Sequence, residues 1–387
     1  MKKDKYFGMS PRIARWKIDN AIENWLSYRA DSSAFWKKMY VSYYRLFDNA
    51  YYLGGLKYLQ GIVNQTLKLD KGMDPDAVMT DMIYCLHRFG ISFQDYCIYD
   101  FLHHPLLSYR TSFVPDKLRY HYCDLLNAPE VSKLMTDKFA CYQRYKPFFK
   151  RDMVGCFTAD DQELFLGFLA RHDRFIYKPL NEHSGHGIEI FQTSEIDVME
   201  FFSSKLPAGP FVLEELIQQG KETARMHPQS VNSCRVVTFF LKGEVHVLAA
   251  TWRIGSGNSI KDNAGSGGMY AAIDVETGQV QTDAINYRGA HFETHPDTGV
   301  RIPGYQLPAW DEAMQLVQDM VRRVKGTTLV SWDIAFSTKG WLMVEANENG
   351  DWSFVQSNKK VGRKADLYAL MDQYMVESKG SSCPKNP

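Results

Sequence analysis

The chain has 387 residues, 45% of them hydrophobic and 23% charged, a composition typical of a soluble globular protein with room for two or three domains. Lys and Arg total 45, as do Asp and Glu, so net charge predicts no attraction to nucleic acid. No apolar stretch reaches the length of a membrane-spanning helix or a signal peptide. The seven cysteines are scattered without a Cys-x-x-Cys pair, so we expect reduced thiols in a cytoplasmic protein and no disulfide framework.

The first 130 or so residues have the sequence pattern of helices. Apolar side chains recur at helical spacing near residues 18–26 and 35–46. Asp74, Pro75 and Gly90 then supply the N-cap, the first-turn proline and the C-terminal glycine of a further helix.

This helical region is rich in aromatic residues. Most fit a packed core, but four lie off the expected apolar faces and are predicted to be exposed: Trp16, Tyr28, Tyr40 and Tyr44. Exposed aromatic residues are common anchors for partners. Two interpretations follow, a purely helical core or a docking surface for a protein partner, a second copy or a membrane.

From about residue 130 the pattern changes to a mixture of helices and strand hairpins, which predicts an α+β fold and not a doubly wound sheet. Helices are expected near 130–146, 159–170, 195–206, 310–324 and 367–374, and strands near 174–180, 211–216, 235–241, 244–252 and around the turn at 337–340.

The segment 329–347 predicts two strands joined by a tight turn ending at Gly340. Side chains alternate along a strand, so Glu345 and Asn347 share one face, and Asp333 on the partner strand can join them. Three oxygen-bearing side chains on an apolar hairpin suit a magnesium ion. The alternative is a solvated sheet face with ordinary polar residues.

Two further segments have the composition of a phosphate and nucleotide site. Lys178-Pro ends a strand and precedes a loop containing Ser184, Gly185 and Gly187, whose backbone can fold over phosphates, although a plain hairpin turn explains the same residues. No helix opens after these glycines, so the loop is neither a Walker A motif nor a Rossmann fingerprint. Glu214 ends an apolar strand, where an acid can meet a ribose or an adenine, or simply mark the exit of the strand into solvent.

Arg235 and Arg253 end two strands expected to pair, and together they suit a phosphate or a carboxylate. The glycine-rich run 255–268 that follows Arg253 predicts a loop that covers substrate and orders when substrate binds. Cys234 is expected to pack in the core and not to act as a nucleophile.

The order of these motifs, ending in Asp333 and Glu345-Ala-Asn347, resembles the ATP-grasp superfamily. The runs Ser230-Val-Asn-Ser-Cys-Arg235 and Ala249-Ala-Thr-Trp-Arg253 resemble its sugar-transfer-associated branch. The resemblance covers roughly residues 130–360. The helical first third departs from the small α/β domain that many ATP-grasp ligases carry in front.

The resemblance implies a role for each matching position. ATP phosphates would be contacted by Lys138 and Lys178 and covered by Ser184, Gly185 and Gly187. The adenine hinge would be Glu214, Glu215 and Ile217, with Glu222 on the ribose. One or two magnesium ions would be held by Asp333, Glu345 and Asn347, and Arg235 and Arg253 would join Lys178 at the reacting phosphate.

The resemblance also implies an ATP-grasp fold, two α+β subdomains that enclose ATP, behind the helical region. We predict a helical domain at 1–128, a lid subdomain at 129–216, a core subdomain at 217–377 and a disordered tail at 378–387.

The activity it implies is that of an ADP-forming ligase, which joins a small-molecule carboxylate to an amine, hydroxyl or thiol through an acyl-phosphate. The expected setting is bacterial polysaccharide or secondary-metabolite biosynthesis. Two alternatives stay open, an ATP-grasp kinase acting on a sugar or polyol hydroxyl, and a nucleotide-binding scaffold of a polysaccharide-assembly complex. The sequence specifies neither the substrates nor the oligomeric state.

Overall fold

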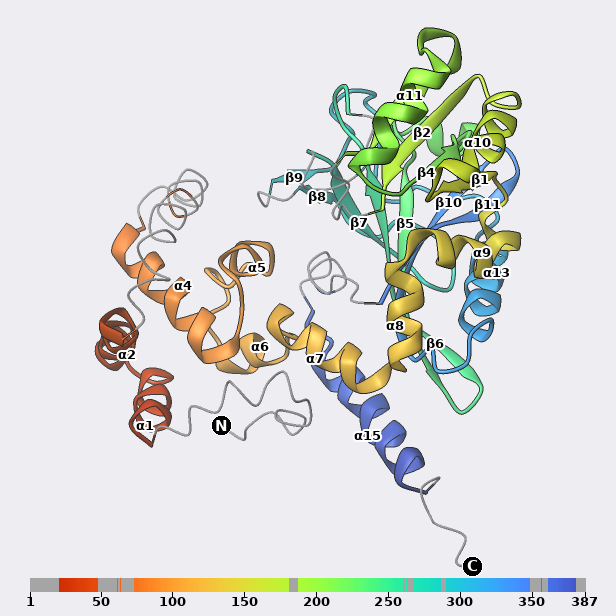
Figure 1. Ribbon diagram of the computed structural model, residues 1–387. Helices are drawn as coiled ribbons and strands as arrows, with labels where there is room; N and C mark the ends of the chain where they lie inside the picture. Colours follow the sequence, from red (N-terminus) through yellow and green to blue (C-terminus); the bar gives the residue numbers. More distant parts are fainter. Residues whose placement is uncertain are drawn as a thin grey trace, which may run out of the picture.

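A computed structural model describes residues 21–47, 61, 63, 73–180, 187–259, 262, 267–286, 290–348, 356 and 361–380. The N-terminal helices lie beside a larger part that contains two sheets (Figure 1). Among the described residues, no helix is long and apolar enough to cross a lipid bilayer. The predicted α+β class with a helical N-terminal region is confirmed.

The N-terminal part consists of short helices around an aromatic core. Asp74 caps α4 through the backbone amide of Asp76, and Gly90 ends that helix with a φ of 75°, as predicted. Ser92 caps α5 by accepting a hydrogen bond from the amide of Asp95. The described helices are α1 (Ala21–Ala30), α2 (Ala34–Phe47), α4 (Pro75–Phe89), α5 (Phe93–Ile98) and α6 (Leu107–Thr111).

Three of the four exposure predictions for this part need correction or fall outside the described residues. Tyr28 is exposed as predicted, but Tyr40 is 1% exposed and packs edge-on against Tyr84 in the helical core. The core lies on a different face of α2 from the one that the apolar pattern indicated, because Tyr40 and Val41 are buried while Phe35 and Met39 are exposed. Trp16 and the side chain of Tyr44 lie outside the described residues.

The smaller sheet is antiparallel and has the strand order β1-β4-β2-β3. Phenylalanines from its strands and from α10 and α11 form a separate core. Its elements are β1 (Met153–Cys156), α10 (Gln162–Leu169), β2 (Arg174–Pro179), β3 (Glu189–Gln192), α11 (Val198–Lys205) and β4 (Phe211–Glu215).

The larger sheet has seven antiparallel strands in the order β11-β10-β5-β6-β7-β8-β9. The hairpin turns predicted at Lys242-Gly243 and before Gly340 are both present. Its strands are β5 (Ser233–Leu241), β6 (Glu244–Ile254), β7 (Met269–Ile273), β8 (Ala284–Asn286), β9 (His291–Phe292), β10 (Leu329–Ser337) and β11 (Gly340–Asn347).

Helices cover the two faces of this sheet unequally. Trp332 and Ile334 face the main core, which α8 (Pro129–Thr136), α9 (Lys138–Phe149) and α13 (Trp310–Arg322) also line. Val237 and Phe239 face the opposite side, where α7 (Asp116–Leu126) and α15 (Lys364–Gly380) pack against them. Because side chains alternate along a strand, Asp333 and Arg235 share this second face, beyond the end that α7 and α15 cover.

The ends of the core connect to elements far away in sequence. Asn127, just after α7, donates to the carbonyl of Leu329 at 2.8 Å and accepts from the amides of Thr328 and Leu329. α15 continues to Gly380, which is three residues into the predicted tail. The predicted domain boundaries stay predictions.

Candidate active site

A β-bulge places Glu345 directly opposite Asp333. Ser337 pairs with Gly340 and Ile334 with Met343, but Asp333 pairs with Glu345, so Val344 is the extra residue between them. In an unbroken hairpin Asp333 would face Val344, and Glu345 would point to the other side of the sheet. The sequence interpretation assumed that the hairpin turn brings the two carboxylates together. The structure shows that the bulge is also required.

The Asp333 carboxylate is buried and held by two arginines on neighbouring strands. Arg235 lies opposite it on β5 and donates from Nε and Nη2 at 2.8 Å each, while Arg253 on β6 donates from Nη1 at 2.6 Å. Burial alone would raise the pKa of Asp333, but the two guanidinium groups lower it to about 2. Asp333 is therefore a carboxylate at any physiological pH.

Glu345 has the opposite electrostatic character. Its side chain is partly exposed, but the protein groups packed around its carboxyl displace water from it. This desolvation is the main cause that raises the pKa of Glu345, and the nearby negative charge of Asp333 raises it further. The amide nitrogen of Asn347 lies 3.4 Å from its Oε1. An ionised Asp333 that opposes the ionisation of the adjacent Glu345, beside an amide, forms a donor set that fits a hard cation.

This set contains only two acids and an amide. No group of three or more His, Cys, Asp and Glu side chains arranged for a metal occurs among the described residues. Magnesium is held in many phosphate sites by one or two carboxylates together with substrate phosphates, so two acids satisfy what it needs from the protein.

Arg151, which follows α9, joins the smaller sheet to the bulge. Its guanidinium donates to the carbonyls of Met343 and, at 3.1 Å, Val344, which flank the bulge, and it forms a buried ion pair with Glu214 on β4. The same Glu214 carboxylate pairs with Lys178 on β2. Burial would raise the pKa of Glu214, but Arg151 and Lys178 lower it. One chain of contacts therefore connects the candidate phosphate lysine to the strand that carries Glu345.

The second candidate lysine lies near the first. Lys138 begins α9, and its Nζ lies 3.4 Å from the carbonyl of Pro179, the residue after Lys178. Lys138 thus contacts the backbone at the end of β2, the strand that carries Lys178.

The predicted adenine and ribose residues have mixed surroundings. Glu215 accepts from the amide of Asp152 at 2.8 Å and pairs with Lys339 at 2.8 Å, so its carboxylate fastens β4 to the turn between β10 and β11. Ile217 lies beyond the end of β4, and Glu222 is exposed on the short α12 (Lys221–Ala224). Their roles toward a nucleotide stay predictions.

The two glycine-containing loops are described only at their edges. Ser184 and Gly185 lie outside the described residues, and Gly187 is exposed with a φ of 68°. The base of the loop after Arg253 is fixed: His227 contacts the carbonyl of Gly257 and His295 that of Gly255, at 2.9 and 2.8 Å. Cys234 is fully buried, as expected for a packing residue.

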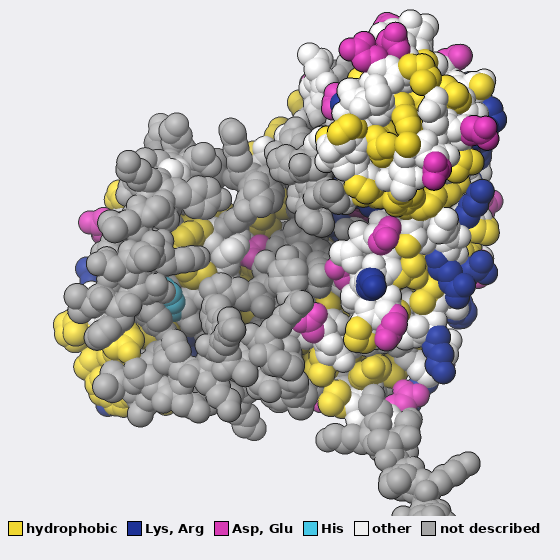
Figure 2. All heavy atoms as spheres, in the orientation of Figure 1, with side chains coloured by type: hydrophobic (Ala, Val, Ile, Leu, Met, Phe, Trp, Pro, Cys, Tyr) yellow, Lys and Arg dark blue, Asp and Glu magenta, His cyan; other side chains and the backbone are white. Residues whose placement is uncertain are grey.

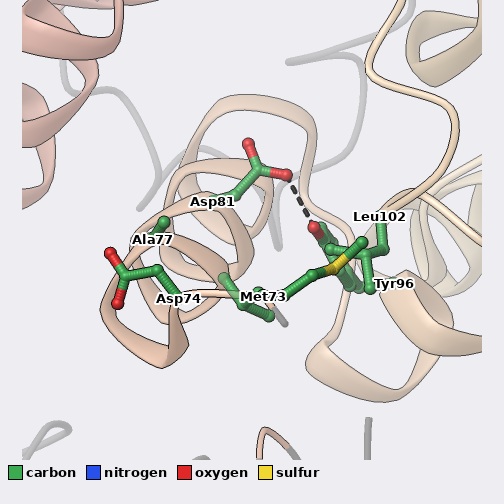
Figure 3. Close-up of a pocket in the computed structure, with 7 residues that line it drawn as sticks. Met73, Asp74, Ala77, Asp81, Tyr96 and Leu102 are labelled. Atoms are coloured by element: carbon green, nitrogen blue, oxygen red, sulfur yellow. Dashed lines mark hydrogen bonds between the residues drawn. The ribbon is translucent and has the colours of Figure 1, made fainter. Parts of the chain in front are cut away.

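A separate hollow of about 220 Å³ lies in the helical part (Figure 3), far from these residues in the fold. The Asp81 carboxylate at its edge accepts from Tyr96 at 2.6 Å, from Lys37 at 2.6 Å and from Arg110 at 2.6 and 3.0 Å. Two of its partners, Tyr96 and Arg110, are buried within the helical part, so we interpret this cluster as a structural ion pair of the helical core.

Sequence reasoning assigned no role to three residues of this region: Arg151, Asp262 and His295. Arg151 stands before a short strand in an ordinary polar stretch, and no motif marks it. Asp262 pairs with Arg253 at 3.1 Å and accepts from the amide of Ser233. Asp262 follows Ser233 by 29 residues in the chain, so the sequence gave no sign of this contact.

The two antiparallel sheets, with the Asp333–Glu345 pair on the larger one, agree with the predicted ATP-grasp fold. The family model described as sugar-transfer associated ATP-grasp matches residues 117–367, more than half of the chain, and includes every candidate residue above. The chain belongs to this family. No curated protein matches it significantly.

Solved structures similar to the chain are also ATP-grasp proteins. The ATP-grasp ligase PsnB, complexed with a minimal precursor, is 15% identical with a TM-score of 0.41 and coverage of 64% of each chain, less than two thirds of PsnB. D-alanyl-alanine synthetase A from Vibrio cholerae is 11% identical, with a TM-score of 0.42 and coverage of 65% of this chain and 68% of that one. Phosphoribosylamine–glycine ligase from Thermotoga maritima is 12% identical, with a TM-score of 0.40 and coverage of 65% and 56%. The family assignment rests on the sequence match, because these structural likenesses are low.

Proposed function

We propose that this protein is an ATP-dependent, ADP-forming ligase that activates a small-molecule carboxylate as an acyl-phosphate. The observation that carries the proposal is the row Glu345, Asp333 and Arg235 across three adjacent strands, connected through Arg151 and Glu214 to Lys178. These contacts support the proposal because they connect the proposed metal-binding acids to the proposed phosphate-binding cations.

ATP and magnesium fit the residues present. Asp333, Glu345 and Asn347 would hold one or two magnesium ions, which when bound offset the negative charge of the phosphates. Lys138 and Lys178 would bind phosphate oxygens as point charges. Glu214, Glu215, Ile217 and Glu222 are the proposed adenine and ribose contacts, and Ser184, Gly185 and Gly187 the proposed cover over the phosphates.

Arg235, Arg253 and Lys178 are the proposed catalytic cations. Both arginines are held in place by Asp333, and Asp262 holds Arg253 from its other side. Fixed guanidinium groups stabilise charge that develops during reaction without having to reorganise. They also reduce the repulsion between the substrate carboxylate and the triphosphate.

The proposed reaction has two steps. A carboxylate oxygen of the substrate attacks the γ-phosphorus, the bond to the β-phosphate oxygen breaks, and ADP leaves. The nitrogen, oxygen or sulfur of an acceptor then attacks the acyl carbon, inorganic phosphate leaves, and the acceptor loses a proton. A site closed to water protects the acyl-phosphate from hydrolysis between these steps.

The test is trapping with hydroxylamine across a panel of amino acids and sugar acids. ADP release together with hydroxamate formation, both lost in Glu345→Gln, is the expected result. ADP release without hydroxamate but with a phosphorylated sugar or polyol would establish the kinase instead. ATP binding without any turnover over the whole panel would favour the nucleotide-binding scaffold.

We further propose a cytoplasmic setting in polysaccharide or secondary-metabolite biosynthesis. The six cysteines of the described residues are free thiols, five of them buried, as expected where thiols stay reduced. The family description supports a link to sugar transfer. The helical first third is proposed to select the substrate or a partner.

A further inference from the structure

Helices α1 and α2 expose a continuous aromatic and basic surface. Trp25, Tyr28 and Phe35 are 49%, 67% and 64% exposed, and Met39, one turn beyond Phe35, is also exposed. Arg29 and Lys38 are exposed among them, and we call these six residues the α1–α2 surface.

Ring contacts join the two helices into one surface. Trp25 on α1 and Phe35 on α2 both pack edge-on against the half-buried Trp36, with ring centroids 5.0 and 5.4 Å apart. The Arg29 guanidinium lies 5.5 Å from the Trp25 ring and 5.9 Å from the Trp36 ring. In Figure 2, hydrophobic side chains gather at the left edge of the molecule, where Figure 1 draws α1 and α2.

The opposite faces of α1 and α2 pack against the helical core. Leu26, Tyr40 and Val41 are buried in the helical core. Asp31, between the helices, accepts from Arg88 of α4 at 2.6 and 2.8 Å, which fixes the helix pair on the domain. The α1–α2 surface is therefore not needed to hold α1 and α2 in place.

The sequence that precedes this surface is basic. The whole chain has equal numbers of acidic and basic residues, yet residues 1–20, which directly precede α1, contain six Lys and Arg and only two Asp. The same 20 residues include apolar and aromatic side chains such as Tyr6, Phe7, Ile13 and Trp16. Basic residues interleaved with aromatic ones are the composition that binds anionic lipid headgroups.

We propose that the α1–α2 surface binds the surface of an anionic phospholipid bilayer. Trp25, Tyr28 and Phe35 would lie at headgroup depth, where amphipathic rings are favoured, and Arg29 and Lys38 would pair with lipid phosphates. A patch for a neutral protein partner would not require the excess of basic residues. The protein would thereby act at a membrane surface.

The experiment is co-sedimentation of the full-length protein with phosphatidylcholine vesicles, with and without added phosphatidylglycerol. Binding to the phosphatidylglycerol vesicles that weakens as salt rises is the expected result. The charge-reversal variant Arg29→Glu/Lys38→Glu should bind at least about thirtyfold more weakly, because each basic residue near the membrane contributes roughly a factor of five. Trp25→Ser/Phe35→Ser should also lose binding.

The matched control replaces exposed apolar residues elsewhere, Leu164→Ser/Met199→Ser on α10 and α11, which are 59% and 51% exposed in the wild type. This variant should bind vesicles like the wild type. Equal loss in the control and in the α1–α2 variants, no binding to anionic vesicles, or a dimer that forms through this surface in place of lipid binding would each overturn the proposal. Circular dichroism of every variant distinguishes lost binding from lost folding.

Discussion

Asp333 lies opposite Glu345 because β11 contains one extra residue, Val344, between the turn and the site. Bulges interrupt the hydrogen-bond ladder of a sheet, so the carbonyls around them need other donors. Arg151 supplies donors to the carbonyls of both Met343 and Val344. A residue outside every motif thus supports the geometry of the candidate metal site.

Arg151→Met should destabilise the fold by about 3–5 kcal/mol, because it leaves buried Glu214 with one cation fewer. Arg151→Lys keeps a charge but cannot reach Glu214 and both carbonyls together, since a lysine lacks the planar fork. We expect this variant to fold and to bind magnesium–ATP at least about tenfold more weakly. Calorimetry of ATP binding with and without magnesium measures this.

The matched control for Arg151 is Arg171→Lys, whose exposed side chain pairs with Asp152 at 2.6 Å. A surface pair contributes about 0–1 kcal/mol, so this variant should behave like the wild type. A folded Arg151→Lys protein with unchanged magnesium dependence would show that Arg151 is only structural. Absence of magnesium-dependent ATP binding in the wild type would instead contradict the proposed function.

Binding of magnesium–ATP should depend on pH through Glu345. Its pKa is raised above the ordinary 4.5 by burial and by Asp333, so protons compete with the metal at a higher pH than for a normal glutamate. As pH falls through that raised pKa, affinity should fall by up to about tenfold per pH unit. Asp333, with a pKa of about 2, should not titrate in this window.

The pH dependence is measured by calorimetry on the wild type and on Glu345→Gln. The variant should bind magnesium–ATP weakly at all pH values and lose ATP turnover, while its unfolding transition stays cooperative. A wild-type affinity that stays constant down to pH 4.5 would argue against a raised pKa at this position.

Asn127 should be important for stability although it lies far from the site. Its side chain makes three buried hydrogen bonds of 2.8–3.0 Å to the start of β10. Asn127→Ala leaves a carbonyl and two amides without these partners, so we expect a loss of about 2–4 kcal/mol of unfolding free energy. Urea denaturation tests this, and a loss below about 0.5 kcal/mol would show that water replaces the amide.

Removal of the helical first third tests whether it belongs to the nucleotide site. The cut must precede α7, because Tyr122 and Leu126 pack in a cluster with β5 and α15. A chain starting at residue 113 should fold and bind ATP like the full-length protein but lose activity on the native substrate. Lost ATP binding in a folded shortened chain would show that the helices belong to the nucleotide site.

Much of this arrangement was predictable from local patterns. The caps of α4, the hairpin at Gly340 and the alternation of Glu345 and Asn347 follow from short-range rules that the structure obeys. The bulge at Val344 was not predictable from local patterns, since its carbonyl is bound by Arg151, nearly two hundred residues earlier in the chain. Tyr40 was misjudged for the same reason, because tertiary packing and not the local apolar pattern decides which helix face is buried.

The most direct test of the metal site is a crystal structure of the protein with manganese and a non-hydrolysable ATP analogue. Our account predicts an anomalous manganese peak in contact with the carboxylates of both Asp333 and Glu345, at about 2.0–2.3 Å from their oxygens. Manganese bound only to the nucleotide, or at any position away from these two side chains, would contradict it.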